Sequence, residues 1–514
     1  MLLHEILEYT AGRLPHKIAL IEDETGLTYG DTLAQAEALS AYLASRGVTV
    51  GDRVALLLPN CIEFCIAYFA VLRLGAIVVP LNNRLAAKEF SYIVNDSRPR
   101  MLVLGYQYWE TYQAFKDSLE EPPDLIYAGE ERKEAAAFFG DLVIPRSDVP
   151  SAPRLSFDDP ACIMYTSGTT GLPKGAVMSH RNIFCNARNA GVHMGYREDD
   201  VTLIVVPLFH VTGLNTQLVA FCYTGGTCVI MRSYSTTRMI ELLAAHKVTT
   251  MITVPTMYTL MLVNPALENA DLSSLRALSY GGAPMALDTI KALHQRLHVD
   301  LFNAYGLTET SSLTTTMPPC DTLRKGASVG LPVTGVQVRV VDTDGKDLPA
   351  GTVGELWVKG PNVITSYWKK PDATEKNLGS GWLRTGDFAR IDEEGFVYVV
   401  DRMKDMINRG GENIYCIEVE SALLDHPDVL EAAVVPRPHS IFGEVVHAFV
   451  VPAPGAHPAQ EALIAHCERL IADYKVPAGI TMLEELPRNP GGKVVKTLLR
   501  TMVPEGDPPR RKQA

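Results

Sequence analysis

The segment from Tyr165 to Gly175, YTSGTTGLPKG, has the composition of a loop that binds polyphosphate. It lies between two apolar runs, 161–165 and 176–178, which predict buried strands. Glycines let backbone N–H groups approach an anion, while hydroxyls and a lysine add donors and positive charge. A glycine-rich surface turn is the alternative, and a Walker A loop is excluded because no Gly-Lys-Ser/Thr follows at the required spacing. The predicted phosphate contacts are Thr166, Ser167, Gly168, Thr169, Thr170, Gly171 and Lys174.

A second segment, Asn303-Ala304-Tyr305-Gly306-Leu-Thr308-Glu309, carries groups suited to a nucleotide and a metal. The ring of Tyr305 can stack on adenine, and the amide of Asn303 can pair with the exocyclic amine of that base. The hydroxyl of Thr308 can bind an α-phosphate. Glu309 offers a hard oxygen ligand for Mg²⁺, which proteins hold through one or two carboxylates together with phosphates. The alternative is that Thr308 caps a helix, but the order after the phosphate loop favours nucleotide binding.

The two segments resemble signatures of the adenylate-forming superfamily, which includes acyl-CoA synthetases, peptide-synthetase adenylation domains and beetle luciferases. The resemblance covers residues 5 to 500, with six motifs in the family order. It implies a carboxylic acid–CoA ligase that uses ATP, Mg²⁺ and coenzyme A. Thr166 and Glu309 are the implied metal ligands, and Thr308, Glu309 and a C-terminal lysine are the implied catalytic residues.

Two further motifs gain a role from this resemblance. Tyr280-Gly-Gly-Ala-Pro284 resembles the segment that packs against adenine and the acyl group, which implies contacts from Gly281, Gly282 and Ala283. Asp387 follows a turn glycine, and its carboxylate can accept hydrogen bonds from both ribose hydroxyls. The guanidinium of Arg402 can bind ribose oxygens from the other side. A simple turn residue is the alternative for Asp387.

Residues 207–213, PLFHVTG, follow a predicted strand, and ligands collect at strand ends in open α/β sheets. In the family this position lines the acyl pocket, and amino-acid-activating relatives carry Asp where this chain has His210. A histidine offers no counter-charge to an α-ammonium, so we predict an acid without an α-amine; a helix-capping histidine is the alternative. The predicted wall suits a fatty, alicyclic or aromatic monocarboxylic acid, and it comprises His210, Val211, Gly213, Leu214, Met257 and Tyr258.

The C-terminal quarter resembles the part of the family that serves both half-reactions. These are the adenylation of the acid and the transfer of its acyl group to CoA. Lys404 matches the hinge position, for which a basic linker is the alternative, and Gly410 and Gly411 match the loop that approaches the pantetheine arm of CoA. Lys493, in a Gly-Gly-Lys turn, matches the lysine that bridges the attacking carboxylate and the α-phosphate. Three other cations are interpreted as surface charges, some of which could contact the phosphates of CoA: Arg437, Lys475 and Lys496.

Length and charge limit the possible classes of protein. A chain of 514 residues predicts two or more domains, and a net charge of −12 argues against nucleic acid as the main partner. The apolar stretch 61–81 contains Glu63 and Arg73, which predicts a core helix and a strand, not a membrane span. Nine cysteines without a CxxC pair and an N-terminus without a signal sequence predict free thiols in the cytoplasm. A homodimer is implied by the family alone.

Alternation of helical and strand patterns predicts an α/β fold with parallel sheets covered by helices. We expect an N-terminal adenylation domain over 1–400, with two α/β subdomains and a β-rich subdomain from about residue 325, where short strands flank turns. A hinge at 401–404 would join it to a mobile α+β lid at 405–500, followed by a disordered tail at 501–514.

Three other functions stay open at this point. The same adenylation chemistry could pass the acyl group to a carrier-protein thiol or oxidise it in a light-emitting reaction. A P-loop kinase or ATPase would release ADP instead of AMP and pyrophosphate. A catalytically silent nucleotide-binding protein could keep the fold, but the presence of Glu309, Asp387, Arg402 and Lys493 argues against it.

Overall fold

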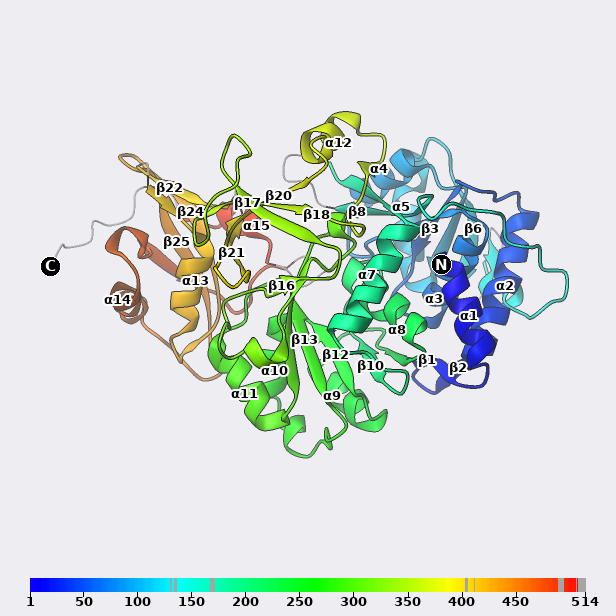
Figure 1. Ribbon diagram of the computed structural model, residues 1–514, viewed down its shortest axis with the longest axis horizontal. Helices are drawn as coiled ribbons and strands as arrows, with labels where there is room; N and C mark the ends of the chain where they lie inside the picture. The colour runs from blue at the N-terminus through cyan, green and yellow to red at the C-terminus, as the bar shows by residue number, and fades with distance from the viewer. Residues whose placement is uncertain are drawn as a thin grey trace.

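The computed structural model describes residues 1–129, 132–133, 136–166, 172–402, 405–410, 412–488, 494–504 and 506. It is an α/β structure with two large parallel-rich sheets, a four-stranded antiparallel sheet and a five-stranded C-terminal sheet. The C-terminal elements gather at one end of the molecule, and the first helices lie at the other (Figure 1). The predicted α/β class with parallel-rich sheets is confirmed.

The first large sheet contains eight strands in the order β19-β9-β8-β4-β3-β5-β6-β7. The strands from β8 to β7 are parallel, whereas β9 pairs antiparallel with β8 and β19 pairs antiparallel with β9. Apolar runs such as 54–57 are buried on both faces, as parallel strands under helices require. The strands are β3 (Arg53–Leu57), β4 (Ile77–Pro80), β5 (Met101–Gly105), β6 (Asp124–Ala128), β7 (Ala137–Phe138), β8 (Pro160–Thr166), β9 (Lys174–Ser179) and β19 (Ser366–Tyr367).

The second large sheet contains nine strands in the order β16-β15-β14-β13-β12-β10-β11-β1-β2. Strands β14 through β1 are parallel, and the remaining three pair antiparallel at the two edges. The strands are β1 (Ile18–Glu22), β2 (Thr25–Thr28), β10 (Val201–Ile204), β11 (Thr227–Ile230), β12 (Thr250–Thr253), β13 (Ala277–Gly281), β14 (Asp300–Tyr305), β15 (Thr315–Thr316) and β16 (Leu331–Pro332).

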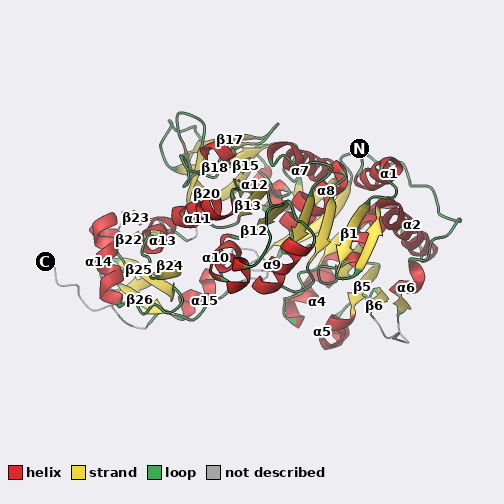
Figure 2. Ribbon diagram, turned by 90° about the horizontal axis from the view of Figure 1, so that it is seen from below, coloured by secondary structure: helices red, strands yellow, loops and turns green. Residues whose placement is uncertain are grey.

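Helices and sheets alternate in layers (Figure 2). One hydrophobic core between the two large sheets joins α1, α2, α3, α7 and α8 to both of them. Helices α9, α10 and α11 cover the outer face of the nine-stranded sheet, and α4 and α5 cover the outer face of the eight-stranded sheet. The helices are α1 (Leu3–Arg13), α2 (Tyr29–Ser45), α3 (Ile62–Arg73), α4 (Ala87–Ser97), α5 (Trp109–Phe115), α6 (Phe139–Leu142), α7 (His180–His193), α8 (Val219–Thr224), α9 (Thr236–Ala245), α10 (Pro255–Val263) and α11 (Leu287–Leu297).

The chain then forms two smaller sheets. The first has the antiparallel order β17-β18-β20-β21, and the second has the order β23-β22-β25-β24 with β26 beside β25. Helices α13 and α14 cover one face of the second sheet, and α15 packs on the other. The elements are β17 (Gln337–Val341), β18 (Gly354–Lys359), α12 (Pro371–Leu378), β20 (Leu383–Ile391), β21 (Val397–Arg402), β22 (Ile407–Arg409), β23 (Glu412–Ile414), α13 (Cys416–Leu424), β24 (Val429–His439), β25 (Gly443–Pro452), α14 (Gln460–Leu470), β26 (Gly479–Met482) and α15 (Lys496–Thr501).

The strands change sheet between Arg402 and Ile407, near the predicted hinge. The predicted hinge residue Lys404 lies outside the described residues, and the division into separate domains stays a prediction. Over the described ranges, no helix combines the length and the apolarity needed to cross a lipid bilayer.

Helix α1 is tied to α7 through a buried histidine. The backbone N–H of Leu3 donates to Nδ1 of His180 at 3.2 Å, and His180 is 1% exposed. Burial, with a further contribution from the neighbouring His4, lowers the pKa of His180 to about 4. The unfolded chain takes up this proton below pH 6.5, whereas the folded chain takes it up only near pH 4. The titration of His180 therefore leaves stability unchanged above pH 6.5 and destabilises the fold progressively as the pH falls from 6.5 toward 4.

We therefore predict that His180→Asn, which keeps an acceptor for Leu3, reduces the acid sensitivity of the fold. Between pH 7 and pH 5 the wild-type free energy of unfolding should fall by about 2 kcal/mol more than that of the variant, measured by urea unfolding. The exposed residue His457 supplies a matched control, His457→Asn. Parallel pH dependence in wild type and His180→Asn would contradict the prediction.

Candidate nucleotide and acyl-adenylate site

The predicted phosphate loop joins two paired strands. Thr166 ends β8 and Lys174 begins β9, and the two residues pair across this antiparallel hairpin. The hydroxyl of Thr166 lies 3.5 Å from the carbonyl of Lys174. The predicted residues between them, Ser167, Gly168, Thr169, Thr170 and Gly171, lie outside the described residues.

Tyr367 connects the base of this hairpin to the predicted metal ligand. It lies in β19, opposite Ala176 of β9, and its hydroxyl donates to Oε1 of Glu309 at 2.9 Å. Nζ of Lys174 lies 5.7 Å from the centre of the Tyr367 ring, a cation–π distance. Burial and the Glu309 carboxylate raise the pKa of Tyr367, which keeps its hydroxyl protonated as a donor. One side chain thus contacts a cation through its aromatic ring and a carboxylate through its hydroxyl.

The turn that carries Glu309 is a short 3-10 helix, η5 (Thr308–Thr310). The hydroxyl of Thr310 accepts a hydrogen bond from Leu307 N–H at 2.9 Å, so Thr308 does not act as the cap. A Cβ atom at Gly306 would lie 1.4 Å from the carbonyl oxygen of Ser312, so the turn requires glycine there. Thr308 is half-buried, and its predicted role as an α-phosphate ligand stays a prediction.

Buried amides hold this turn from three directions. Asn362 donates to the carbonyls of Thr310 and Leu313 at 3.1 and 2.7 Å. The side chain of Asn215 donates to the carbonyl of Ser311 at 3.0 Å. Additional support comes from the Ile364 N–H, which donates to the Glu309 carbonyl at 2.9 Å, and from Asn186, which accepts from the Leu313 N–H at 2.8 Å.

The residues predicted to bind adenosine contact one another, although they come from three strands: Tyr305 from β14, Asp387 from β20 and Arg402 from β21. The hydroxyl of Tyr305 donates to Oδ2 of Asp387 at 2.6 Å, and Nε of Arg402 lies 3.4 Å from Oδ1. Asp387 is 3% exposed and lies within a strand, so the alternative of a simple turn residue is wrong. Burial and the Asp387 charge raise the pKa of Tyr305, so its hydroxyl remains a donor.

Asn303 is also buried, and its amide orientation is fixed. Its Nδ2 donates to the carbonyl of Ser328 at 2.9 Å, and the Ser328 hydroxyl donates to the carbonyl of Val397 at 2.7 Å. Because the amide nitrogen can only donate, Oδ1 is the atom that can accept a hydrogen bond from the exocyclic amine of adenine.

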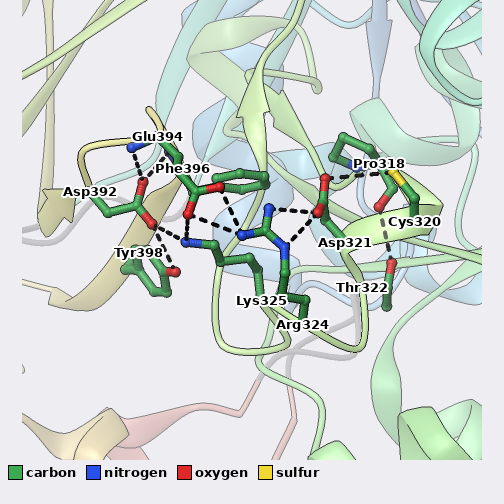
Figure 3. Close-up of polar contacts among 10 residues, drawn as sticks. All are labelled: Pro318, Cys320, Asp321, Thr322, Arg324, Lys325, Asp392, Glu394, Phe396 and Tyr398. Atoms are coloured by element: carbon green, nitrogen blue, oxygen red, sulfur yellow. Dashed lines mark hydrogen bonds and ion pairs between the residues drawn. The ribbon is translucent and has the colours of Figure 1, made fainter.

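An ion-pair cluster ties the segment before Ser328 to the turn between β20 and β21 (Figure 3). Arg324 lies 2.7 Å from Asp321 and 2.8 Å from Glu394, and Lys325 lies 2.7 Å from Asp392. These contacts hold the segment 318–328 against the four-stranded sheet, beside the strand that carries Arg402.

The glycine turn after β13 lies beside the same strand ends. Gly281 pairs with Ala304, and a Cβ atom at Gly281 would lie 2.4 Å from the Ala304 carbonyl oxygen. Close strand pairing therefore already requires this glycine. Gly282 has a φ of +81°, and both Gly282 and Ala283 are exposed.

The residues predicted to line the acyl pocket have several environments. Nδ1 of His210 accepts a hydrogen bond from Thr212 N–H at 3.3 Å, at the start of a π-helix, η3 (Thr212–Leu218), so the capping alternative has structural support. Val211, Leu214 and Tyr258 are at most 2% exposed, and the Tyr258 hydroxyl donates to the carbonyls of Met251 and Ser279. These are contacts of core residues, and the acyl-pocket role stays a prediction.

Two other predicted pocket residues also make internal contacts. The Thr253 hydroxyl donates to Sδ of the half-buried Met257 at 2.6 Å. A Cβ atom at Gly213 would lie 2.5 Å from the Pro207 carbonyl oxygen, so the π-helix passes too close to that carbonyl for any other residue.

In the C-terminal part, Gly410 has a φ of +61° and donates its N–H to the carbonyl of Phe442 at 2.8 Å. Gly411 and Lys493 lie outside the described residues. Among the residues that the structure describes, no three His, Cys, Asp or Glu side chains form a metal-binding group. The single carboxylate of Glu309 still fits Mg²⁺ bound to a nucleotide, because phosphates and water supply most ligands of that ion.

The interpretation of the C-terminal cations as surface charges is wrong for Arg437 and Lys496, whereas Lys475 is half-buried in an ion pair with a more exposed carboxylate. Lys496 pairs with Glu420 at 2.7 Å, with side chains 18% and 10% exposed, and Lys475 pairs with Glu418 at 2.7 Å. Arg437 is 6% exposed and donates to the carbonyl of Gly506 at 2.9 Å. Composition gives the charge of a residue but not the partner that folding places beside it.

Sequence reasoning also missed Tyr367, Asn362, Asn215, Asn186 and Ser328. No local signal identifies them, because each acts on a segment at least 25 residues away. Their partners become visible only after the sheets assemble.

Comparisons with known proteins identify the family. Residues 7–368 match the family described as AMP-binding enzyme, and residues 418–493 match the AMP-binding enzyme C-terminal domain. The chain is 36% identical over 505 residues to indoleacetate–CoA ligase of Aromatoleum aromaticum, which covers 98% of each protein. It is 35% identical over 495 residues to the fatty acid–[acyl-carrier-protein] ligase ScoC of Streptomyces coeruleorubidus, covering 95% of this chain and 93% of that relative.

Solved structures show the same relationship. The anthranilate CoA ligase AuaEII in complex with anthranoyl-AMP superposes with a TM-score of 0.93 and 28% identity, over 98% of this chain and 97% of that one. ATP-bound MatB from Rhodopseudomonas palustris superposes with a TM-score of 0.88 and 30% identity, over 98% and 99%. The predicted membership in the adenylate-forming superfamily is confirmed, and the chain belongs to the AMP-binding enzyme family.

Proposed function

We propose that the protein is an ATP-dependent carboxylic acid–CoA ligase. In the first half-reaction a carboxylate oxygen of the acid bonds to the α-phosphorus of ATP, and the bond to the β-phosphate oxygen breaks, releasing pyrophosphate. In the second, the CoA sulfur bonds to the acyl carbon, the bond to the AMP oxygen breaks, and the thiol proton is lost. The observation that carries the proposal is the joint placement of Lys174 and Glu309 on Tyr367, beside the phosphate hairpin.

The protein would accelerate adenylation by positioning and by charge neutralisation. Lys174 and the loop residues would bind the β- and γ-phosphates, and Thr308 would bind the α-phosphate. Tyr305 and Asn303 would bind adenine, while Asp387 and Arg402 would bind ribose. Mg²⁺, held by Glu309, Thr166 and the triphosphate, would neutralise charge on the departing pyrophosphate.

Each half-reaction also needs the C-terminal part. Lys493 would bridge the attacking carboxylate and the α-phosphate during adenylation. Rotation about the hinge near Lys404 would then bring Gly410 and Gly411 to the pantetheine arm of CoA. The predicted lid at 405–500 is the part that would move.

The acid is proposed to be an apolar monocarboxylate without an α-amine. His210 provides no carboxylate to pair with an ammonium group. Curated relatives named feruloyl-CoA synthase, indoleacetate–CoA ligase and long-chain-fatty-acid–CoA ligase support this class. The fatty acid–[acyl-carrier-protein] ligase among the relatives supports a second candidate, in which a carrier-protein thiol replaces CoA. A cytoplasmic location and a homodimer are further parts of the proposal.

The decisive experiment measures pyrophosphate release from ATP with a panel of fatty, alicyclic and aromatic acids. We expect one acid class to give turnover that depends on CoA. Each reaction is run with CoA, with a phosphopantetheinylated carrier protein, and with neither. Turnover only with the carrier protein would favour the second candidate, and no pyrophosphate release with any acid would contradict adenylation.

We predict that Lys493→Ala slows adenylation by at least about a hundredfold, because the lysine neutralises charge that develops at the α-phosphate. Formation of thioester from supplied acyl-adenylate and CoA should stay near the wild-type rate. ATP–pyrophosphate exchange and thioester formation are measured separately, and Lys346→Ala at an exposed turn is the matched control. Equal losses in the two half-reactions would refute the assigned role.

We predict that Tyr367→Phe weakens metal binding about tenfold in the presence of ATP, because a hydrogen-bond donor behind a metal ligand orients that ligand. Binding is measured from the electron paramagnetic resonance signal of free Mn²⁺, which does not depend on turnover. Glu309→Gln should lose more affinity, and Tyr106→Phe at an exposed tyrosine should lose none. Unchanged Mn²⁺ affinity in Tyr367→Phe would restrict this tyrosine to a packing role.

A further inference from the structure

The loop that carries Lys493 is closed at its base by a short antiparallel pairing. Arg488 and Val494 form an isolated β-bridge, and the N–H of Val495 donates to the carbonyl of Pro487 at 2.8 Å. The segment between the bridged residues, 489–493, ends in Lys493 and lies outside the described residues. The positions of Arg488 and Val494 therefore fix where this loop leaves and rejoins the C-terminal part.

Arg488 also connects the C-terminal part to the large α/β part. Its Nη2 donates to Oγ1 of Thr256, the second residue of α10, at 3.0 Å. The same nitrogen pairs with Glu431 of β24, and the two side chains are only 27% and 14% exposed. Glu431, in the C-terminal part, binds the same guanidinium and orients it. The Arg488 side chain is therefore already oriented toward Thr256 when the two parts come together.

After the loop, α15 is anchored within the C-terminal part. Lys496, its first residue, pairs with Glu420 at 2.7 Å, and Arg500 pairs with Asp405 at 2.9 Å. Neither of these ion pairs reaches the large α/β part. The loop base therefore moves together with the C-terminal sheet, and the contact with Thr256 relates that unit to α10.

We propose that the hydrogen bond between Arg488 and Thr256 is a latch that positions the Lys493 loop for adenylation. The proposal rests on the proposed function. Thr256 precedes Met257, a predicted pocket residue, so the bond places the base of the lysine loop at the edge of the predicted acid site. The latch belongs to one arrangement of the two parts, and rotation for the CoA step breaks it. Arg488 is thus a positioning residue that acts through Lys493.

The test compares Thr256→Val, which removes the acceptor at constant shape, with Thr256→Ser, which keeps it. We expect Thr256→Val to lower the rate of ATP–pyrophosphate exchange about tenfold, the effect of losing a hydrogen bond from a charged donor. Thioester formation from supplied acyl-adenylate and CoA should remain at the wild-type rate, and Thr256→Ser should restore exchange. The KM for the acid should be unchanged, since the latch acts on the lysine loop.

Thr259→Val is the matched control, because the Thr259 hydroxyl bonds to the Pro255 carbonyl within α10. Arg488→Met should reproduce the loss, and the double variant with Thr256→Val should lose no more than Arg488→Met alone. Equal losses in both half-reactions, or wild-type exchange in Thr256→Val, would overturn the latch while adenylation itself stands. Absence of exchange in the wild type with every acid would overturn the proposed function and the latch together.

Discussion

The position of the turn that presents Glu309 depends on directed hydrogen bonds, several of which come from one short segment, residues 361–367. From this segment the Ile364 N–H, the Asn362 amide and the Tyr367 hydroxyl all bond to the turn. The same segment ends in β19, which pairs with β9 of the phosphate hairpin. A set of directed hydrogen bonds thus fixes the distance between a carboxylate from one sheet and a lysine from the other, and a catalytic site that works by electrostatic placement requires such a fixed distance.

Buried polar groups around the turn show how this precision is maintained. Asn182, Asn186, Asn215 and Asn362 are at most 3% exposed, and each bonds to a backbone group. Burial of an amide is unfavourable unless it is hydrogen-bonded, so each of these bonds favours the loop position that provides it. Oδ1 of Asn215 and Oδ1 of Asn362 have no partner among the described residues. Ser311 and Ser312 adopt positive φ angles of 54° and 120° in the same turn. Such strained backbone persists where the surroundings over-determine it.

The C-terminal part uses buried charge for a similar purpose. Asp401 is 2% exposed at the end of β21, accepts hydrogen bonds from the N–H groups of Arg402 and Cys416, and lies near Lys496. Burial raises the pKa of Asp401 to about 6. The end of β21, which precedes the predicted hinge residue, is thereby linked to α13 and α15. A charged group without partners would be too costly to bury here, so these contacts define one preferred arrangement.

The α/β class and the family could be predicted from the sequence alone, because strand–helix alternation and short motifs depend on neighbouring residues. The resemblance also implied that Tyr305, Asp387 and Arg402 share one site; the structure brings the three together, and their role in nucleotide binding stays a prediction. Tertiary structure decided which atoms they present: Asp387 accepts from Tyr305, and Asn303 has its nitrogen occupied by Ser328. It also decided that Tyr367 contacts Glu309, that Arg488 contacts Thr256, and that Lys496 forms an ion pair with Glu420. The physical reason is that these contacts join segments distant in the chain, and no local pattern of residues encodes the partner that a sheet brings alongside.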